Sequence, residues 1–360
     1  MKCVLKFNSS NNFTSRKGKM KISFELIKKI TSGAAYVTEE ANGVTFHRFN
    51  KAEEEMYKEL DVIRKRTDSL RVMTPAGVKL SFITNSKTIK MTADLSFSSR
   101  RFFAFDIFEN GNLLTSITSF KESELPFEYS ILNYELGRFE ESATLSDGEK
   151  EVTIHLPWSA KMENFNLFID DGASIIPAEK PTKKIMLYGD SITQGFDALY
   201  PHRRYAAKLA ELLGAEEFNK AIGGEVFNPL LATHKADFTP DYITVAYGIN
   251  DWLDDREASF KTDAREFYLR LSNNYPDSKI FAITPIWTSE CNAERKVGSF
   301  SFVAEHIADI TKDLPNVTVI KGGDLVPHYT DLFADLFLHP RDAGFDFYAM
   351  NLYNEIKKHI

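Results

Sequence analysis

The stretch Lys184-Ile-Met-Leu-Tyr-Gly-Asp-Ser-Ile-Thr-Gln-Gly195 decides how this chain folds. An apolar run of this length is typical of a buried strand, and Gly189 lets the backbone bend sharply where the run ends. Proteins that alternate strands and helices place their chemistry at the carboxyl ends of parallel strands. We therefore expect Ser191 on an exposed turn at a strand end, at the mouth of a crevice.

Two further segments repeat this arrangement. Residues 241–251, Asp-Tyr-Ile-Thr-Val-Ala-Tyr-Gly-Ile-Asn-Asp, are another apolar run that ends in a turn, which carries Asn250 and Asp251. Near the end of the chain, His339 stands before Pro340. Each segment alone is ordinary turn chemistry. Together, strand-end loops that bring a serine, a carboxamide and an imidazole into one domain predict a nucleophile, an oxyanion donor and a general base.

In four sequence blocks the chain resembles the SGNH hydrolases, also called the GDSL esterases and lipases. The blocks are Gly-Asp-Ser at 189–191, Asn-Lys-Ala-Ile-Gly-Gly-Glu at 219–225, Gly-Ile-Asn-Asp at 248–251 and His-Pro at 339–340. A motif is a hypothesis that its structural context must support. Here the blocks occur in the right order, at predicted strand ends, over about half of the chain.

The resemblance implies a role for each matching residue. Ser191 is the nucleophile, and His339 is the base that takes its proton, because a serine hydroxyl is a poor nucleophile near neutral pH. The amides of Ser191 and Gly224 and the side chain of Asn250 form the oxyanion hole. Gly223 stands beside Gly224 and leaves the register of that block open. Asp190 and Asp251 are expected to hydrogen-bond loop backbone, and such a site needs no cofactor and no metal.

The fourth block departs from the family pattern. The family has an aspartate three residues before the histidine, where this chain has Leu336, and Asp335 is one residue too early. A local bulge could bring the Asp335 carboxylate to His339, or a backbone carbonyl could orient the imidazole and leave a Ser-His dyad. Some members of the family that the chain resembles, including two-domain carbohydrate esterases, look as if they use a Ser-His dyad of this kind. We expect partial orientation by backbone, with Asp335 contributing less than a full triad acid.

Composition excludes several classes of protein. With 360 residues and 43% hydrophobic content the chain is long enough for two ordinary domains. The net charge of −7, without a long basic stripe, argues against nucleic acid as a partner. No apolar run has transmembrane length, and residues 1–20 lack a signal-peptide core, so we expect a cytoplasmic protein with no membrane partner. Cys3 and Cys291 indicate neither a disulfide framework nor a metal site.

The N-terminal half reads as a β-sandwich. Residues 1–19 are polar and are predicted to be a disordered tail, and Met20 could be the natural start. A β-sandwich domain, jelly-roll-like, is predicted over 20–177, with a helical insertion at 52–65 and two hairpin turns, Asn110-Gly111 and Asp147-Gly148. Its clearest strands are expected at 43–49, 78–82, 88–95, 102–108 and 151–155.

The pattern of apolar residues changes after a linker bounded by two prolines, Pro177-Ala-Glu-Lys-Pro181. From 182 to 360, strands are predicted at 184–189, 216–221, 241–247, 279–286 and 317–320, and helices at 203–213, 258–274, 300–312 and 344–359. This alternation indicates a parallel sheet covered by helices on both faces, the three-layer, flavodoxin-like α/β/α fold that the SGNH resemblance also implies. A β-sandwich ahead of such a domain is similar to two-domain acetyl esterases that act on carbohydrates.

The function predicted is a serine esterase that removes a short acyl group, acetate above all, from a sugar or related small molecule. Two alternatives stay open: a carbohydrate-binding protein whose α/β domain is catalytically weak, and an acyltransferase that uses the same residues. Trp252 and Trp287 follow two strand ends and could wall the pocket and stack on a sugar, or could be core. The sequence indicates neither the alcohol half of the ester nor an oligomeric state.

Overall fold

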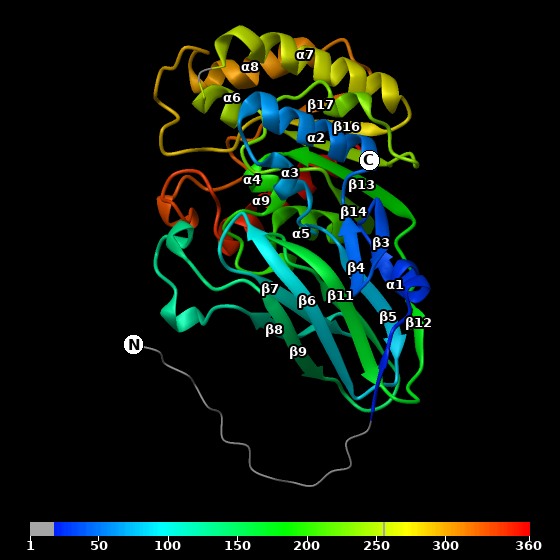
Figure 1. Cartoon of the computed structure of the whole chain (residues 1–360). Coiled ribbons are helices and arrows are strands. Elements are labelled where there is room, and N and C mark those ends of the chain that lie inside the picture. The colour runs from blue at the N-terminus through cyan, green and yellow to red at the C-terminus, as the bar shows by residue number, and fades with distance from the viewer. Residues whose placement is uncertain (1–17, 255) are drawn as a thin grey trace.

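A computed structural model of the chain describes residues 18–254 and 256–360 (Figure 1). Most of the predicted tail, residues 1–17, lies outside the described residues, as does Cys3. The first strand, β1 (Lys19–Lys21), pairs antiparallel with β11 (Ala160–Asp170), which places Lys19 opposite Asp170. The sandwich therefore starts at least one residue before the predicted boundary, and Met20 lies inside a paired strand.

The N-terminal half contains two antiparallel sheets that pack face to face, as predicted for a β-sandwich. One sheet has the order β3-β4-β11-β6-β9 with β1 added to β11, and the other has the order β12-β5-β10-β7-β8 with β2 added to β5. The further strands are β2 (Thr31–Ser32), β3 (Tyr36–Glu40), β4 (Gly43–His47), β5 (Lys79–Thr84), β6 (Thr88–Ser98), β7 (Ala104–Glu109), β8 (Asn112–Thr118), β9 (Arg138–Thr144), β10 (Lys150–His155) and β12 (Ile175–Pro177).

Side chains that alternate along each strand form the core of the sandwich. In β5, Leu80, Phe82 and Thr84 are buried while the residues between them are half-exposed. This period of two places Phe82 against residues of the opposite sheet, such as Leu167, in one apolar cluster. The strands predicted in this half of the chain are confirmed to within a few residues.

The two predicted hairpin turns have different outcomes. Asn110 and Gly111 both have positive φ, 48° and 78°, and join β7 to β8, which pair antiparallel. This hairpin is confirmed, because a two-residue turn of this type needs positive φ at both positions. The hairpin predicted at Asp147-Gly148 is wrong: the turn joins β9 to β10, which lie in different sheets. A turn signal marks a reversal of the chain but not which strands then pair.

The helices of this half are α1 (Phe24–Ile30), α2 (Lys51–Arg64) and α3 (Asp68–Val72), with short 3-10 turns η1 (Glu122–Glu124) and η2 (Tyr129–Ile131). Asn50 caps α2 and forms a capping box with Glu53. The buried residues Met56, Tyr57 and Leu60 of α2 belong to the same apolar cluster as the parallel sheet of the C-terminal half. Figure 1 shows α2 beside the C-terminal helices, so the predicted helical insertion helps to cover the second domain.

The C-terminal half is the predicted α/β domain. Its five strands are all parallel, in the order β14-β13-β15-β16-β17. The strands are β13 (Lys183–Gly189), β14 (Ala215–Asn219), β15 (Tyr242–Ala246), β16 (Lys279–Ile283) and β17 (Val317–Ile320). The helices are α4 (Ser191–Gln194), α5 (Tyr205–Leu212), α6 (Ile249–Leu253), α7 (Glu257–Asn274), α8 (Phe300–Thr311) and α9 (Asp342–Ile356), with 3-10 turns η3 (Pro201–Arg203), η4 (Leu231–Thr233) and η5 (Thr330–Leu332).

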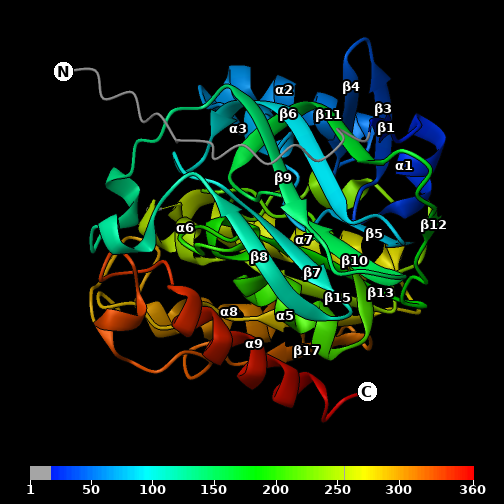
Figure 2. The same ribbon diagram turned by 90° about the horizontal axis from the view of Figure 1, so that it is seen from below.

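Helices cover both faces of the parallel sheet. In Figure 1, α7 and α8 lie on one side of the sheet and α5 and α9 on the other, and Figure 2 shows α9 at the edge of the molecule next to the C-terminus. The order is that of flavodoxin-like folds. All predicted strands and helices of this domain are confirmed, with ends shifted by at most three residues. No helix in the described residues is long and apolar enough to cross a membrane.

Candidate active site

Ser191 lies where β13 ends and α4 begins. The side chain of Asp190 caps α4 by accepting a hydrogen bond from the Ile192 N–H at 3.0 Å. A Cβ on Gly189 would lie 2.1 Å from Oγ1 of Thr193, so only glycine fits at this bend. Ser191 is only 5% exposed, so the exposed turn expected from the sequence is wrong, although the residue does line an opening.

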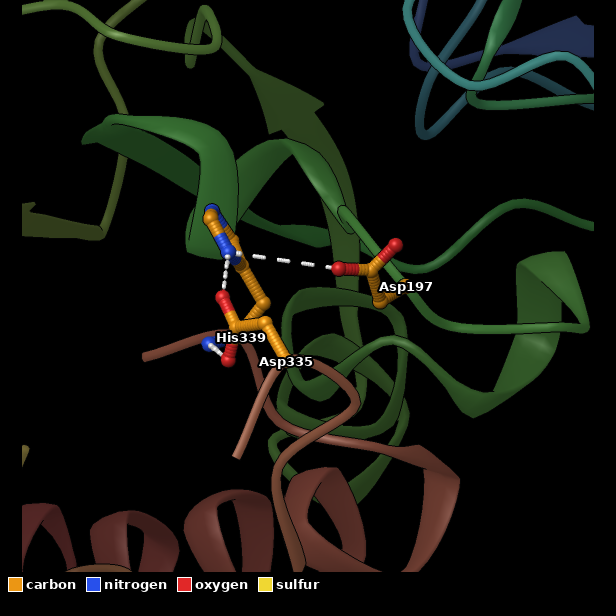
Figure 3. Close-up of side chains that lie close together, drawn as sticks. All are labelled: Asp197, Asp335 and His339. Atoms are coloured by element: carbon orange, nitrogen blue, oxygen red, sulfur yellow. Dashed lines mark hydrogen bonds and ion pairs between the residues drawn. The ribbon is translucent and has the colours of Figure 1, made fainter. Parts of the chain in front are cut away.

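The predicted serine, histidine and aspartate lie in one chain of contacts. Oγ of Ser191 is 2.8 Å from Nε2 of His339, and Nδ1 of the same ring is 2.7 Å from Oδ2 of Asp335. Figure 3 shows the Asp335 carboxylate directed at the ring. Each ring nitrogen therefore has one partner, and the contact with Asp335 fixes the orientation of the imidazole.

Asp335 is held as a carboxylate by its surroundings. Its Oδ1 accepts the backbone N–H groups of Phe337, Leu338 and His339 at 2.9, 2.7 and 3.1 Å. Burial by itself raises the pKa of Asp335, but the hydrogen bond and charge of His339 and the backbone donors outweigh it. The pKa of Asp335 is therefore held well below its ordinary value, and the group is charged at neutral pH.

We expected the backbone to orient the imidazole in part, but Nδ1 of His339 contacts the carboxylate of Asp335, and the conformation of one residue accounts for this. Leu336 has φ of 58°, in the left-handed region that a leucine rarely adopts. This conformation folds the loop back, so that a carboxylate four residues before His339 reaches the ring instead of one three residues before it. The local bulge that the sequence left open is the arrangement in the structure.

A second carboxylate, which the sequence analysis missed, lies near the same nitrogen. Oδ2 of Asp197 is 3.9 Å from Nδ1 of His339, the nitrogen that also contacts Asp335 (Figure 3). Asp197 is buried and pairs with Arg100, whose Nε and Nη2 donate to its two oxygens at 2.7 and 3.0 Å. Asp197, Asp335 and His339 are close enough to share a metal ion. However, these carboxylates are already satisfied by a guanidinium, three N–H groups and the imidazole.

The three residues expected to form the oxyanion hole, Ser191, Gly224 and Asn250, line one opening. In the described chain, the backbone N–H groups of Ser191 and Gly224 have no hydrogen-bond partner. The N–H of Gly223 donates to Oε1 of Gln194 at 2.8 Å, so Gly224 is the available donor of the two glycines. The side chain of Asn250 donates to the carbonyl of Glu225 at 2.9 Å and lines the same opening.

These groups lie around an opening of about 400 Å³. Residues from both halves of the chain line it: Arg66, Thr67, Arg71, Arg100, Ser191, Phe196, Gly223, Gly224, Asn250, Asp254 and His339. The three arginines come from the N-terminal half and belong to no motif of the sequence. Phe196 stacks on His339 with 5.8 Å between the ring centres. The guanidinium of Arg100 lies over the Phe196 ring, 4.7 Å from its centre.

The two tryptophans lie away from the opening. Trp252 is fully buried, donates its Nε1–H to the carbonyl of Gly298 at 3.0 Å and packs against Phe300, so it is a core residue. Trp287 stacks on His328 and contacts Phe333. The suggestion that these side chains wall the pocket is therefore wrong. An aromatic residue after a strand end can point into the core as readily as into a cleft.

Asp190 and Asp251 have the surroundings expected of residues that hold loops. Burial raises the pKa of each to about 7. Oδ2 of Asp251 accepts the Phe227 N–H at 3.3 Å, and its other oxygen pairs with Arg256 at 3.2 Å. These contacts fix the loops that carry Ser191 and Asn250, and neither carboxylate lines the opening.

Comparison with known proteins agrees with this geometry. Residues 187–347 match the GDSL-like Lipase/Acylhydrolase family, a segment that runs from β13 into α9. No curated protein matches the chain.

Several solved structures share the whole two-domain fold. The salicylyl-acyltransferase SsfX3 from a tetracycline biosynthetic pathway is 15% identical, with a TM-score of 0.76 over 96% of this chain and 98% of its own. A putative GDSL-like lipase from Bacteroides ovatus is 20% identical, with a TM-score of 0.71 over 95% and 98%. An active-site mutant of a family two carbohydrate esterase from Clostridium thermocellum is 15% identical, with a TM-score of 0.61 over 96% and 99%.

At these identities the solved structures establish the fold, and the family match identifies the domain that carries Ser191, Asn250 and His339. Residues 187–347 of this chain therefore carry a GDSL-like lipase and acylhydrolase domain by similarity, and the two-domain fold is like that of the family two carbohydrate esterases.

Proposed function

We propose that this protein is a serine esterase that hydrolyses short acyl esters, acetyl esters above all, of a carbohydrate or related small molecule. The observation that carries the proposal is the line of contacts from Ser191 through His339 to Asp335, beside two backbone N–H groups without partners. The family match and the esterase and acyltransferase neighbours support acyl hydrolysis or transfer as the class of activity.

The proposed reaction assigns each step to a residue that lines the opening or contacts one that does. Nε2 of His339 takes the proton of the Ser191 hydroxyl as Oγ attacks the ester carbonyl. The carbonyl oxygen becomes an oxyanion that the N–H groups of Ser191 and Gly224 and the Asn250 amide can stabilise, where losing one donor typically costs about 3 to 4 kcal/mol of barrier. The alcohol leaves with the proton from His339. Water then attacks the acyl-serine with the same base, releasing the acid.

Asp335 supports the base throughout. Its carboxylate accepts the Nδ1–H of His339, which leaves Nε2 free to accept the Ser191 proton and stabilises the imidazolium that forms. We therefore replace the predicted dyad with a serine, histidine and aspartate triad in this proposal.

Two features favour a small polar substrate. The opening is about 400 Å³ and is lined mostly by polar and charged side chains, which suits a sugar better than a lipid tail. Carbohydrate esterases from Clostridium thermocellum share the fold, one of them solved in complex with cellohexaose. An acetyl xylan esterase from Butyrivibrio proteoclasticus shares it too, with a TM-score of 0.61.

Acyl transfer is the second candidate, because an acyltransferase shares the fold with a TM-score of 0.76. The same residues would form the acyl-serine, and a second alcohol would replace water. Adding increasing concentrations of an acceptor sugar to the assay separates the two reactions, since transfer yields an acylated acceptor and hydrolysis yields free acid.

The test is hydrolysis of p-nitrophenyl acetate by the purified protein, followed by a screen of acetylated sugars. A fluorophosphonate should inactivate the enzyme and leave an adduct whose mass maps to Ser191. Dialysis against EDTA should leave the rate unchanged. A protein that binds sugars but shows neither hydrolysis nor a labelled serine would be the carbohydrate-binding alternative, and a rate lost to EDTA and restored by zinc would contradict the serine mechanism.

A further inference from the structure

Two arginines from the N-terminal half are held side by side at the active-site opening. Arg66 and Arg71 lie on either side of Asp68, which is fully buried. Nε of Arg66 and Nη1 of Arg71 both donate to Oδ1 of Asp68, at 3.1 and 3.0 Å. The two side chains are 28% and 26% exposed, and both line the opening that contains Ser191. One buried carboxylate thus sets two guanidinium groups on the same rim.

The two guanidinium groups have donors left over. Arg66 donates through Nη2 to the carbonyl of Gly223 at 3.3 Å, and that nitrogen lies 2.6 Å from where a Cβ on Gly224 would be. Its charge is therefore directly beside the available N–H of Gly224. Nε of Arg71 is buried and has no partner among the described residues. This donor is therefore free to meet an acceptor that a ligand supplies.

The third arginine of the opening is different. Nε and Nη2 of Arg100 donate to both oxygens of Asp197, so its charge is neutralised by its partner. Asp254 is the one carboxylate among the lining side chains. Asp68 is shared by both Arg66 and Arg71, so it can offset only one of their two charges. Among the described residues Asp254 forms no ion pair with Arg66 or Arg71, so the two guanidinium groups share one paired carboxylate.

We propose that Arg66 and Arg71 bind an anionic group, a carboxylate or a phosphate, carried by the alcohol half of the ester. Guanidinium groups suit both anions because their planar N–H donors match pairs of anionic oxygens. The inference rests on the proposed esterase function: an acetyl group is neutral and has no further atoms to place at the arginines, so the charge must be on the alcohol half. The substrate class is then an acetylated acidic sugar or sugar phosphate.

The experiment compares three esters that carry acetate on the same hydroxyl group: mono-O-acetyl galactose, mono-O-acetyl galacturonic acid and mono-O-acetyl galactose 6-phosphate. We expect kcat/KM for at least one charged ester to exceed that of the neutral ester by about tenfold or more, the range of a charge-assisted hydrogen bond. The larger of the two ratios identifies carboxylate or phosphate as the group recognised. Raising the salt concentration should reduce the ratio by screening.

The variant that tests the assignment is Arg71→Gln, because the Arg71 side chain contacts Asp68 and no catalytic loop. It should raise KM for the charged ester and bring the ratio close to one, and Arg71→Lys should restore part of the preference. Arg138→Gln is the matched control, since Arg138 is exposed and pairs with Asp94 on the sandwich, and it should leave the ratio unchanged. A wild-type ratio of one or less, or a ratio that survives Arg71→Gln, overturns the proposal.

A binding measurement separates this proposal from the proposed catalysis. Ser191→Ala, which cannot form the acyl-serine, is titrated calorimetrically with the same three esters. Tighter binding of a charged ester, abolished by adding Arg71→Gln, supports the arginine site even if the protein proves to have no esterase activity. Equal affinity for all three esters contradicts it even if p-nitrophenyl acetate is hydrolysed.

Discussion

The two halves of this chain contribute to one site in different ways. The α/β domain supplies Ser191, Asn250 and His339 from loops at the carboxyl edge of its sheet. The sandwich half supplies Arg66 and Arg71, with no recognisable motif. The reactive groups of an esterase act on the ester bond, which is the same in many substrates. The residues that line the opening beside them contact the rest of the substrate, which differs from one substrate to the next. The difference teaches that sequence motifs mark the candidate reactive groups, whereas the residues that the neighbouring domain adds to the same opening carry no motif.

The sandwich also fixes the position of the reactive loops. The guanidinium of Arg48, which is buried, donates to the carbonyls of Arg71, Asn219 and Ala221 and also to that of Thr74. Arg48 thereby ties the loop that leads to Gly224 to the N-terminal half. The first domain is a structural part of the active site rather than an appended module.

The largest expected effect lies entirely in the α/β domain. Ser191→Ala removes the attacking hydroxyl, so kcat for p-nitrophenyl acetate should fall by at least about four orders of magnitude. The melting temperature should change little, because the substitution deletes a single oxygen atom whose partner, His339, lines the opening. Near-wild-type activity in this variant would mean that the site lies elsewhere.

The next effect distinguishes the two carboxylates beside His339. In Asp335→Asn, Oδ1 can still accept the three backbone N–H groups, but the amide NH2 faces Nδ1 and disfavours the required tautomer. We expect a fall in kcat of about four orders of magnitude, as for the orienting aspartate of a triad.

Asp197→Asn is the matched control for that comparison. Asp197 is 3.9 Å from Nδ1 and is already paired with Arg100, so kcat should fall far less, by about tenfold. Equal losses in the two variants, measured with the fold intact by circular dichroism, would show that both acids orient the ring. A small loss in Asp335→Asn alone would restore the dyad.

A moderate effect tests whether the halves are interdependent. Arg48→Met leaves several buried carbonyl groups without donors, at a cost of about 1 to 3 kcal/mol each before relaxation. We expect the free energy of unfolding in urea to fall by about 3 kcal/mol or more, in one cooperative transition, with a lower kcat. Arg138→Gln, an exposed pair, should stay within about 0.5 kcal/mol of wild type. Two separate transitions would show independent domains.

The smallest effect contrasts the acids of the two halves. Burial raises the pKa of Asp342, in the α/β domain, to about 7, above its value of about 4 in the unfolded chain. Its contribution to stability is therefore complete below about pH 4 and is lost as the pH rises to 7. Asp342→Asn should reduce the fall in unfolding free energy between pH 5 and pH 8 by about 2 to 3 kcal/mol, because roughly two pKa units of the shift lie within that range of pH.

The pKa of Asp170, in the sandwich, is shifted in the opposite direction from that of Asp342. Burial alone raises its pKa, but hydrogen bonds from Lys19, Thr88, Ser86 and Lys87 outweigh it and hold the pKa below its ordinary value. Its contribution is present above about pH 4 and is lost as the pH falls below that. Asp170→Asn should therefore destabilise the protein at pH 7 and have little effect near pH 2, in thermal unfolding. The same sign of pH dependence for both variants would contradict the contrast.

Local sequence determined the α/β domain almost completely. Apolar runs such as the one before Gly189 must be buried, and a buried run followed by an amphipathic helix has few ways to fold other than as a parallel sheet with helices on its faces. The positions of Ser191, Asn250 and His339 at strand ends follow from that order. The sandwich was predicted as a class, but strand pairing was not: the turn at Asp147-Gly148 joins two sheets, because pairing depends on contacts distant in sequence.

Only the tertiary structure decided which side chains share the opening. The left-handed backbone at Leu336 brings Asp335 to His339, a conformation that no residue preference would suggest for leucine. Burial of Trp252 excludes it from the pocket, and packing of α2 on the second domain brings Arg66 to the rim. Sequence patterns report which residues are buried and where the chain turns, because both follow from local chemistry. Which distant side chains meet follows from how the two domains pack, and that is set by the summed contacts of the whole interface.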